Sequence, residues 1–208
     1  MNMLKSRKIR IISLVLTCVL IAVCFVMPAS AATGNQGYAI HRDGAFFGTT
    51  WHAGLMDEPK SSNYLPVLHI GGLNQGVTWC SWSDFINGNT FKGVYKPNSG
   101  ITSSGRDNIV SMGRRLRTED LGYTPFSQID HFVTSSSSWV FPEDLWLIRC
   151  DGVVEYCFEW YGYRIYGDNT YWDITRGGSA TLNHHSGTMV TPKSQAQSYM
   201  TLVQSSTP

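Results

Sequence analysis

Short apolar runs alternate with turn residues between positions 37 and 70. The runs cover 38–40, 53–56 and 65–68, and the residues between them include Asp43, Gly44 and the polar stretch 58–63. Apolar runs of this length, bounded by Gly, Pro, Asn and Ser, are typical of β-strands. Because consecutive strands usually pair with one another, the pattern predicts an antiparallel meander. The segment 76–79 is a candidate for a further strand.

Two later segments have the spacing of amphipathic helices. The first covers 106–117, after a sequence at 104–107 that resembles a capping box. The second begins near Cys150, runs to about Tyr161 and is stopped by Gly162. An edge strand is expected at 163–166 and a short helix at 194–199, while the small polar stretches 98–105 and 134–138 are expected to be loops. Together these elements predict an α+β domain.

The first 31 residues have the organisation of a secretory signal peptide. Lys5, Arg7, Lys8 and Arg10 precede an apolar run at 11–27, and small residues at 29–31 form a cleavage site. A retained membrane anchor is the alternative, but the apolar run is near the short limit for a spanning helix. We therefore expect a single domain at 32–208 that is secreted or associated with the cell wall and is not held in a membrane.

Charge and cysteine content narrow the function classes further. The chain has 16 basic and 15 acidic residues, so it has no basic field for nucleic acid. Without the leader, with its four basic residues, twelve basic residues remain against fifteen acidic ones. The remaining cysteines are Cys80, Cys150 and Cys157, an odd number, so at least one is free or pairs between chains. A small domain stapled by disulfides is thereby excluded.

Cys150 is the strongest candidate for a nucleophile. A cysteine in the first turn of a helix faces unsatisfied N–H groups and the positive end of the helix dipole, and we expect these to lower its pKa. The predicted meander brings His52, at the start of one strand, close to His69, at the end of the next. One imidazole could exchange protons with the sulfur while the other fixes its tautomer, although histidines at strand ends are more often structural.

Three segments resemble the NlpC-type cell-wall hydrolases, a papain-like family. The stretch 149–158 is similar to the family's nucleophile helix, 51–56 and 67–69 are similar to its two histidine strands, and 191–197 is similar to a segment that follows the helix. Here the histidines precede the cysteine, an order that a circular permutation would produce. The resemblance implies a papain-like cysteine hydrolase, circularly permuted, whose antiparallel sheet packs on the nucleophile helix. Residues 71–142 have no counterpart in it.

The same resemblance implies the roles of individual residues. Cys150 matches the nucleophile, His52 the general base and His69 the polar residue that orients the base. The implied reaction is hydrolysis of an amide bond, most simply in peptidoglycan stem peptides, without a cofactor or metal. The family's residues on either side of the cysteine line the substrate pocket. Arg149 and Asp151 occupy these positions here, and Trp51 is close enough to His52 to shape the cleft.

Alternatives remain for the substrate and for catalysis itself. Because Arg149 and Asp151 depart from the family's pattern, the substrate could be another amide, or an ester or acyl group of a lipid, as in permuted acyltransferase relatives. The many tryptophans and tyrosines also fit a carbohydrate- or wall-binding module without activity. The adjacent His184 and His185 have no further ligand nearby and are expected in a turn. The sequence leaves the oligomeric state open.

Overall fold

The computed structural model describes residues 34–45, 50–57, 66–135, 137–165, 173–177 and 191–206. All of them belong to one compact unit, Ala31–Pro208. The predicted leader, the polar stretch 58–63 and the histidines at 184 and 185 lie outside the described residues. Within the part of the chain that is described, no helix is both long enough and apolar enough to cross a membrane.

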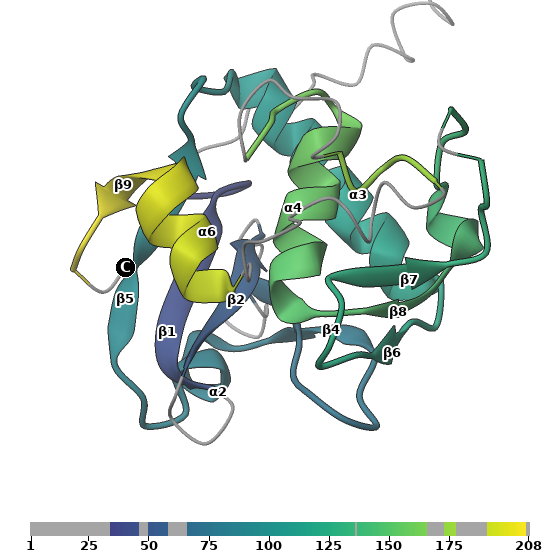
Figure 1. Ribbon diagram of the computed structural model, residues 1–208. Helices are drawn as coiled ribbons and strands as arrows, with labels where there is room; N and C mark the ends of the chain where they lie inside the picture. The colour runs from purple at the N-terminus through teal and green to yellow at the C-terminus, as the bar shows by residue number, and fades with distance from the viewer. Residues whose placement is uncertain are drawn as a thin grey trace, which may run out of the picture. The chain divides into compact units, whose positions relative to one another are not determined.

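A six-stranded antiparallel sheet organises the fold (Figure 1). Its strands, in spatial order, are β4 (Val77–Cys80), β3 (Val67–Ile70), β2 (Thr50–Met56), β1 (Ala39–Ala45), β5 (Phe91–Pro97) and β9 (Met200–Gln204). Strands β1 to β4 follow one another in space as they do in sequence, which confirms the predicted meander and its candidate fourth strand. Strands β5 and β9 extend the sheet and were not predicted.

A second sheet of three short strands was not predicted, and two of its strands lie within residues 71–142, which have no counterpart in the family resemblance. Strand β8 (Leu145–Ile148) pairs parallel with β6 (Gly122–Tyr123) and antiparallel with β7 (Ile129–His131). The short 3₁₀ helix η1 (Pro142–Asp144) leads directly into β8. Because β8 ends two residues before Cys150, this sheet fixes the position at which the following helix begins.

In the described part of the chain, four α-helices accompany the two sheets. They are α2 (Trp82–Ile86), α3 (Ser103–Thr118), α4 (Cys150–Trp160) and α6 (Pro192–Tyr199). The predictions for α3, α4 and α6 are confirmed, although α3 starts three residues earlier and is capped by the Thr102 hydroxyl. Gly162 follows α4 with a φ of 79°, as a helix-terminating glycine should. The edge strand predicted at 163–166 is wrong over its described residues 163–165, which form no strand.

Helix α4 is the centre of the core. Residues 150–159 are all buried, so the helix is enclosed on every side rather than lying on the surface. It packs on β2 and β3, with α3 as a neighbour. At Gly113 of α3 an added Cβ would lie 2.6 Å from a methyl carbon of Leu68, so a side chain there would push the helix off the sheet. The α+β class is thus confirmed, with the candidate nucleophile helix packed on an antiparallel sheet.

Candidate active site

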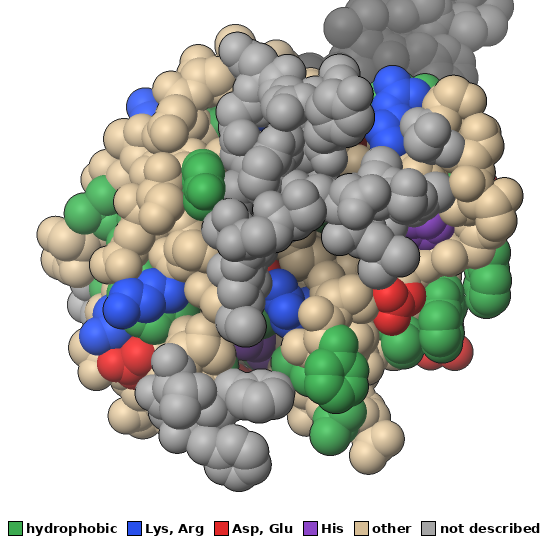
Figure 2. Space-filling view, viewed as in Figure 1, with side chains coloured by type: hydrophobic (Ala, Val, Ile, Leu, Met, Phe, Trp, Pro, Cys, Tyr) green, Lys and Arg blue, Asp and Glu red, His purple; other side chains and the backbone are tan. Residues whose placement is uncertain are grey.

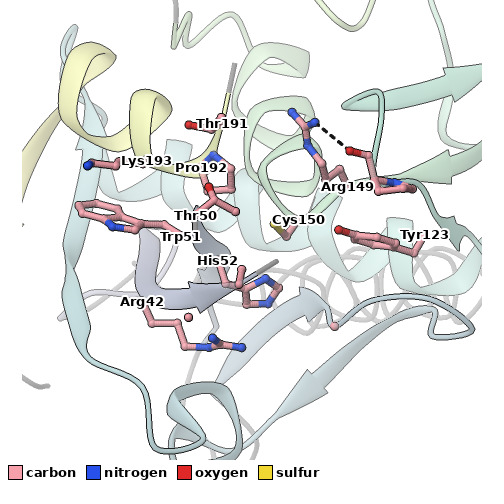
Figure 3. A pocket seen from close by; sticks show the side chains of 14 residues that line it. Arg42, Thr50, Trp51, His52, Tyr123, Arg149, Cys150, Thr191, Pro192 and Lys193 are labelled. Atoms are coloured by element: carbon pink, nitrogen blue, oxygen red, sulfur yellow. Dashed lines mark hydrogen bonds between the residues drawn. The ribbon is translucent and has the colours of Figure 1, made fainter. Parts of the chain in front are cut away.

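A cavity of about 520 Å³ opens where the start of α4 meets strands β1 and β2 (Figure 3). Its walls come from parts of the chain that are far apart in sequence. The lining residues are Arg42, Gly44, Ala45, Thr50, Trp51, His52, Gly71, Tyr123, Pro125, Arg149, Cys150, Thr191, Pro192 and Lys193. Four of the six residues singled out from the sequence, namely Trp51, His52, Arg149 and Cys150, therefore line one cavity.

The two predicted histidines are direct neighbours. The β2–β3 register pairs Leu55 with Leu68, which places His52 and His69 diagonally opposite on the same face. Their rings meet at 81°, and His52 Nε2 lies 2.8 Å from His69 Nδ1 in a hydrogen bond. The predicted contact between them is confirmed. Because Nε2 of His52 is engaged with His69, its Nδ1 is the nitrogen left to exchange a proton with a group in the cavity.

The side chain of Cys150 reaches the same cavity from the first residue of α4 (Figure 3). It is a free thiol with only 4% of its surface exposed. The backbone N–H groups of Ala53 and Asp151 donate hydrogen bonds to its sulfur. Since Ala53 directly follows His52, the sulfur is held against the strand that carries the candidate base. This contact joins the start of the helix to β2.

Burial dominates the ionisation of the site. Loss of hydration raises the pKa of Cys150 to about 12, and the Asp151 carboxylate acts in the same direction. Burial also lowers the pKa of His52 well below its usual value and that of His69 to about 4, with the charge of Arg42 contributing to both. The expectation that the pKa of Cys150 is lowered is wrong, because desolvation outweighs the hydrogen bonds that its sulfur accepts and the charge of Arg149. At neutral pH the site holds a thiol and two uncharged imidazoles.

A network of hydrogen-bonded polar side chains holds the start of α4. Arg149 donates two hydrogen bonds, of 2.6 and 2.8 Å, to the Asp151 carboxylate. Gln128 donates to both Asp151 and Glu155, and Gln195 donates to Glu155 and to the Asp151 carbonyl. These contacts join two separate chain segments, and the residue that precedes the helix, to the first turns of the helix. They hold the helix start in place without occupying the cavity.

This network corrects one prediction. Asp151 was expected to contact substrate, but its side chain is fully buried and it does not line the cavity. Its carboxylate points toward Arg149 and Gln128, because a charge at that depth needs partners. Arg149 and Trp51 do line the cavity, as expected, and His69 lies behind His52.

Several lining residues were not anticipated from the sequence. Tyr123, on β6, is half-buried, and burial and the nearby Cys150 sulfur both raise the pKa of its hydroxyl. In Figure 3 that hydroxyl points toward Cys150. Arg42 faces His52 directly across the β1–β2 pair. Of these three residues, only Lys193 had a signal in the sequence, because it belongs to the stretch 191–197 that resembles a family segment.

The described residues contain no cluster of three or more His, Cys, Asp or Glu side chains that could hold a metal ion. Comparisons of the chain with known protein families, with curated proteins and with solved structures find no match.

Proposed function

We propose that this protein is a cysteine hydrolase that cleaves amide bonds. The observation that carries the proposal is the convergence of a free thiol at a helix start and a hydrogen-bonded pair of histidines on one cavity. Nucleophilic catalysis by sulfur needs a base within reach and a third group that orients the base. Cys150, His52 and His69 are suited to these three roles.

The first step of the proposed reaction is proton transfer during attack. Because both groups are neutral at rest, His52 takes the thiol proton as the Cys150 sulfur bonds to the amide carbonyl carbon. The tetrahedral intermediate then expels the amine, which receives that proton from His52. Water, deprotonated by the same imidazole, hydrolyses the thioester and restores the thiol. No oxidant, reductant or cofactor enters the balance.

His69 acts as a positioning residue in this scheme. For Nδ1 of His52 to accept the thiol proton, the hydrogen of the neutral ring must sit on Nε2 and be donated to His69 Nδ1, 2.8 Å away. The lowered pKa of His69, to about 4, keeps it neutral and able to accept. A neutral acceptor fixes the tautomer but stabilises the imidazolium less than a carboxylate would. This agrees with a resting site that has no thiolate.

The negative charge of the tetrahedral oxygen needs hydrogen-bond donors. The first backbone N–H groups of an α-helix have no intrahelical acceptor, and α4 begins at Cys150, which lines the cavity. The Tyr123 hydroxyl is a second donor, since it lines the same cavity beside the sulfur. We assign these groups to the oxyanion.

We infer further that the fold is a circularly permuted papain-like one and that the substrate is a peptide of the bacterial cell wall. An antiparallel sheet with two histidines, packed on a helix that begins with the cysteine, is the arrangement that the NlpC-type resemblance implies. The leader expected from the sequence would deliver the enzyme outside the membrane, where peptidoglycan peptides are found. An ester or a lipid acyl group is the competing substrate.

A non-catalytic wall- or carbohydrate-binding module is the second candidate. Phe132 and Trp146 stack with ring centroids 5.8 Å apart and are 72% and 48% exposed. Such an aromatic pair on the surface is a suitable platform for a sugar ring. This candidate requires nothing of Cys150.

The experiment compares turnover of the purified chain with that of two matched variants, Cys150→Ala and Cys157→Ala. Soluble muropeptides and ester-linked analogues are incubated with each, and new amines, acids and alcohols are measured by mass spectrometry. We expect the chain and its Cys157→Ala variant to release amines, and Cys150→Ala to lose on the order of 10³-fold or more. Equal release by all three, or none from the native chain, contradicts the proposal. Cleavage of the esters alone favours the lipid alternative.

A further inference from the structure

The cavity carries a local positive charge that the composition of the chain does not require. Among the described residues that line it, Arg42, Arg149 and Lys193 are cationic and none is acidic. The whole chain, by contrast, has nearly equal numbers of basic and acidic residues. The low-dielectric walls of a cavity strengthen the attraction of such charges for an anion.

The three cations are not equivalent. Arg149 is already neutralised by its two hydrogen bonds to the Asp151 carboxylate. Lys193 is exposed and lies in the first turn of α6, where solvent screens its charge. Arg42 is only partly exposed, and no ion pair with a described residue neutralises it. This arginine therefore contributes the unbalanced charge of the cavity.

The surroundings of Arg42 hold its guanidinium in place without balancing its charge. One terminal nitrogen donates to the Asp43 carbonyl at 2.7 Å, and the guanidinium carbon lies 5.7 Å from the centre of the Phe85 ring. Its Nε is buried and has no hydrogen-bond partner among the residues that the structure describes. The adjacent Asp43 carboxylate forms an ion pair with Lys92 at 2.9 Å. A guanidinium so held has donors left for an anion that enters the cavity.

The location of Arg42 specifies which part of a substrate it would meet. It pairs with His52 across β1 and β2, so the two side chains lie on the same face of the sheet, and Figure 3 places them side by side. In the proposed reaction His52 delivers its proton to the departing amine. Atoms attached to that amine must therefore lie close to Arg42.

We propose that Arg42 binds a carboxylate carried by the leaving group, so that the preferred substrate is an amide of an amino acid with a free carboxylate near the scissile nitrogen. The inference rests on the proposed function, because it assigns the leaving side from the role of His52. Binding of the carboxylate would offset the charge of Arg42, one of the causes that lower the pKa of His52. The base would thereby become stronger when the correct substrate is present.

The test uses two small alkylating reagents that differ in charge and require no substrate. Iodoacetate carries a carboxylate and iodoacetamide does not, and the ratio of their rate constants at Cys150 reports an anion site beside the sulfur. We expect this ratio to fall on the order of tenfold in Arg42→Gln, and to be largely retained in Arg42→Lys. The control is Arg117→Gln, which removes a cation that lies over Trp79 and does not line the cavity.

Equal ratios in the native chain and in Arg42→Gln overturn the inference and leave the proposed function intact. If Cys150 resists both reagents, the proposed nucleophile fails instead. The anion site is then measured by calorimetric titration with N-acetylglycine and N-acetylglycinamide. Binding of the acid alone, lost in Arg42→Gln but kept in Arg117→Gln, supports the inference, and any other result overturns it.

Discussion

Cys150 and Cys157 lie seven residues apart on α4, two turns along the same side of the helix, and both are buried free thiols. Burial raises the pKa of each. Their surroundings differ: Cys157 is enclosed in the apolar core, while Cys150 lines a cavity with His52, Tyr123 and Arg42. Burial and a raised pKa therefore do not separate a reactive cysteine from a structural one. A reactive cysteine is distinguished by neighbouring groups that can accept its proton and bind its substrate.

The largest effect on turnover is expected when the base is removed, which would make the surroundings of Cys150 resemble those of Cys157. In His52→Ala the thiol keeps its burial and loses its proton acceptor, so turnover should fall by about 10²- to 10⁴-fold. Amine release from muropeptides measures this. His131→Ala is the control, because His131 lies on β7 and does not line the cavity. An activity that survives in His52→Ala would contradict the claim that the proton acceptor is what distinguishes Cys150 from Cys157.

A smaller effect is expected at His69, which positions the base and does not line the cavity. In His69→Asn the amide oxygen can still accept the hydrogen bond from His52, so turnover should stay within about tenfold. In His69→Ala that acceptor is lost, and turnover should fall by roughly 10- to 100-fold. Rescue by asparagine, in kcat rather than KM, distinguishes an orienting role from simple packing. Equal activity of the two variants would argue against that role.

The smallest effect concerns stability at acidic pH. Burial lowers the pKa of His69 to about 4, so between pH 6.5 and 4 the unfolded chain binds a proton that the folded chain does not. The stability that results is present above pH 6.5 and is lost as the pH falls, by at most about 1.4 kcal/mol per pH unit. His41 and His52 act in the same direction, whereas the raised pKa of Glu159 acts in the opposite one.

Urea unfolding at pH 7 and pH 5 measures this effect as a difference between two chains. The decrease in unfolding free energy from pH 7 to pH 5 should be smaller in His69→Asn than in the native chain, because the substituted residue does not titrate. His41 and Glu159 contribute equally to both chains, while loss of the His69 charge leaves the pKa of His52 less depressed, which makes the decrease in His69→Asn smaller still. An identical decrease in the two chains would show that His69 titrates normally in the folded state.

The parts of the site that lie in long, regular patterns were predictable from the sequence. The meander followed from apolar runs and turn residues, and it brought His52 next to His69. The start of α4 at Cys150 and its end before Gly162 followed from helical spacing and a terminating glycine.

Other parts of the site depend on interactions that local sequence does not encode. Tyr123 lies on a strand of two residues that exists only because β8 pairs with it. Arg42 faces His52 through a register that local pattern does not reveal. The depth of burial, which reversed the expected shift in the pKa of Cys150, results from packing on every side of α4.

The most direct test of the account is the site of alkylation in the native chain. The purified protein is treated with limiting iodoacetamide at pH 7, and the modified cysteine is identified by peptide mapping. We predict modification of Cys150, sparing of Cys157 and Cys80 until denaturant is added, and slower labelling of Cys150 by at least about tenfold in His52→Ala. Labelling of Cys157 as fast as that of Cys150, or a rate at Cys150 that is indifferent to His52, would contradict the assignment of Cys150 and His52 as nucleophile and base.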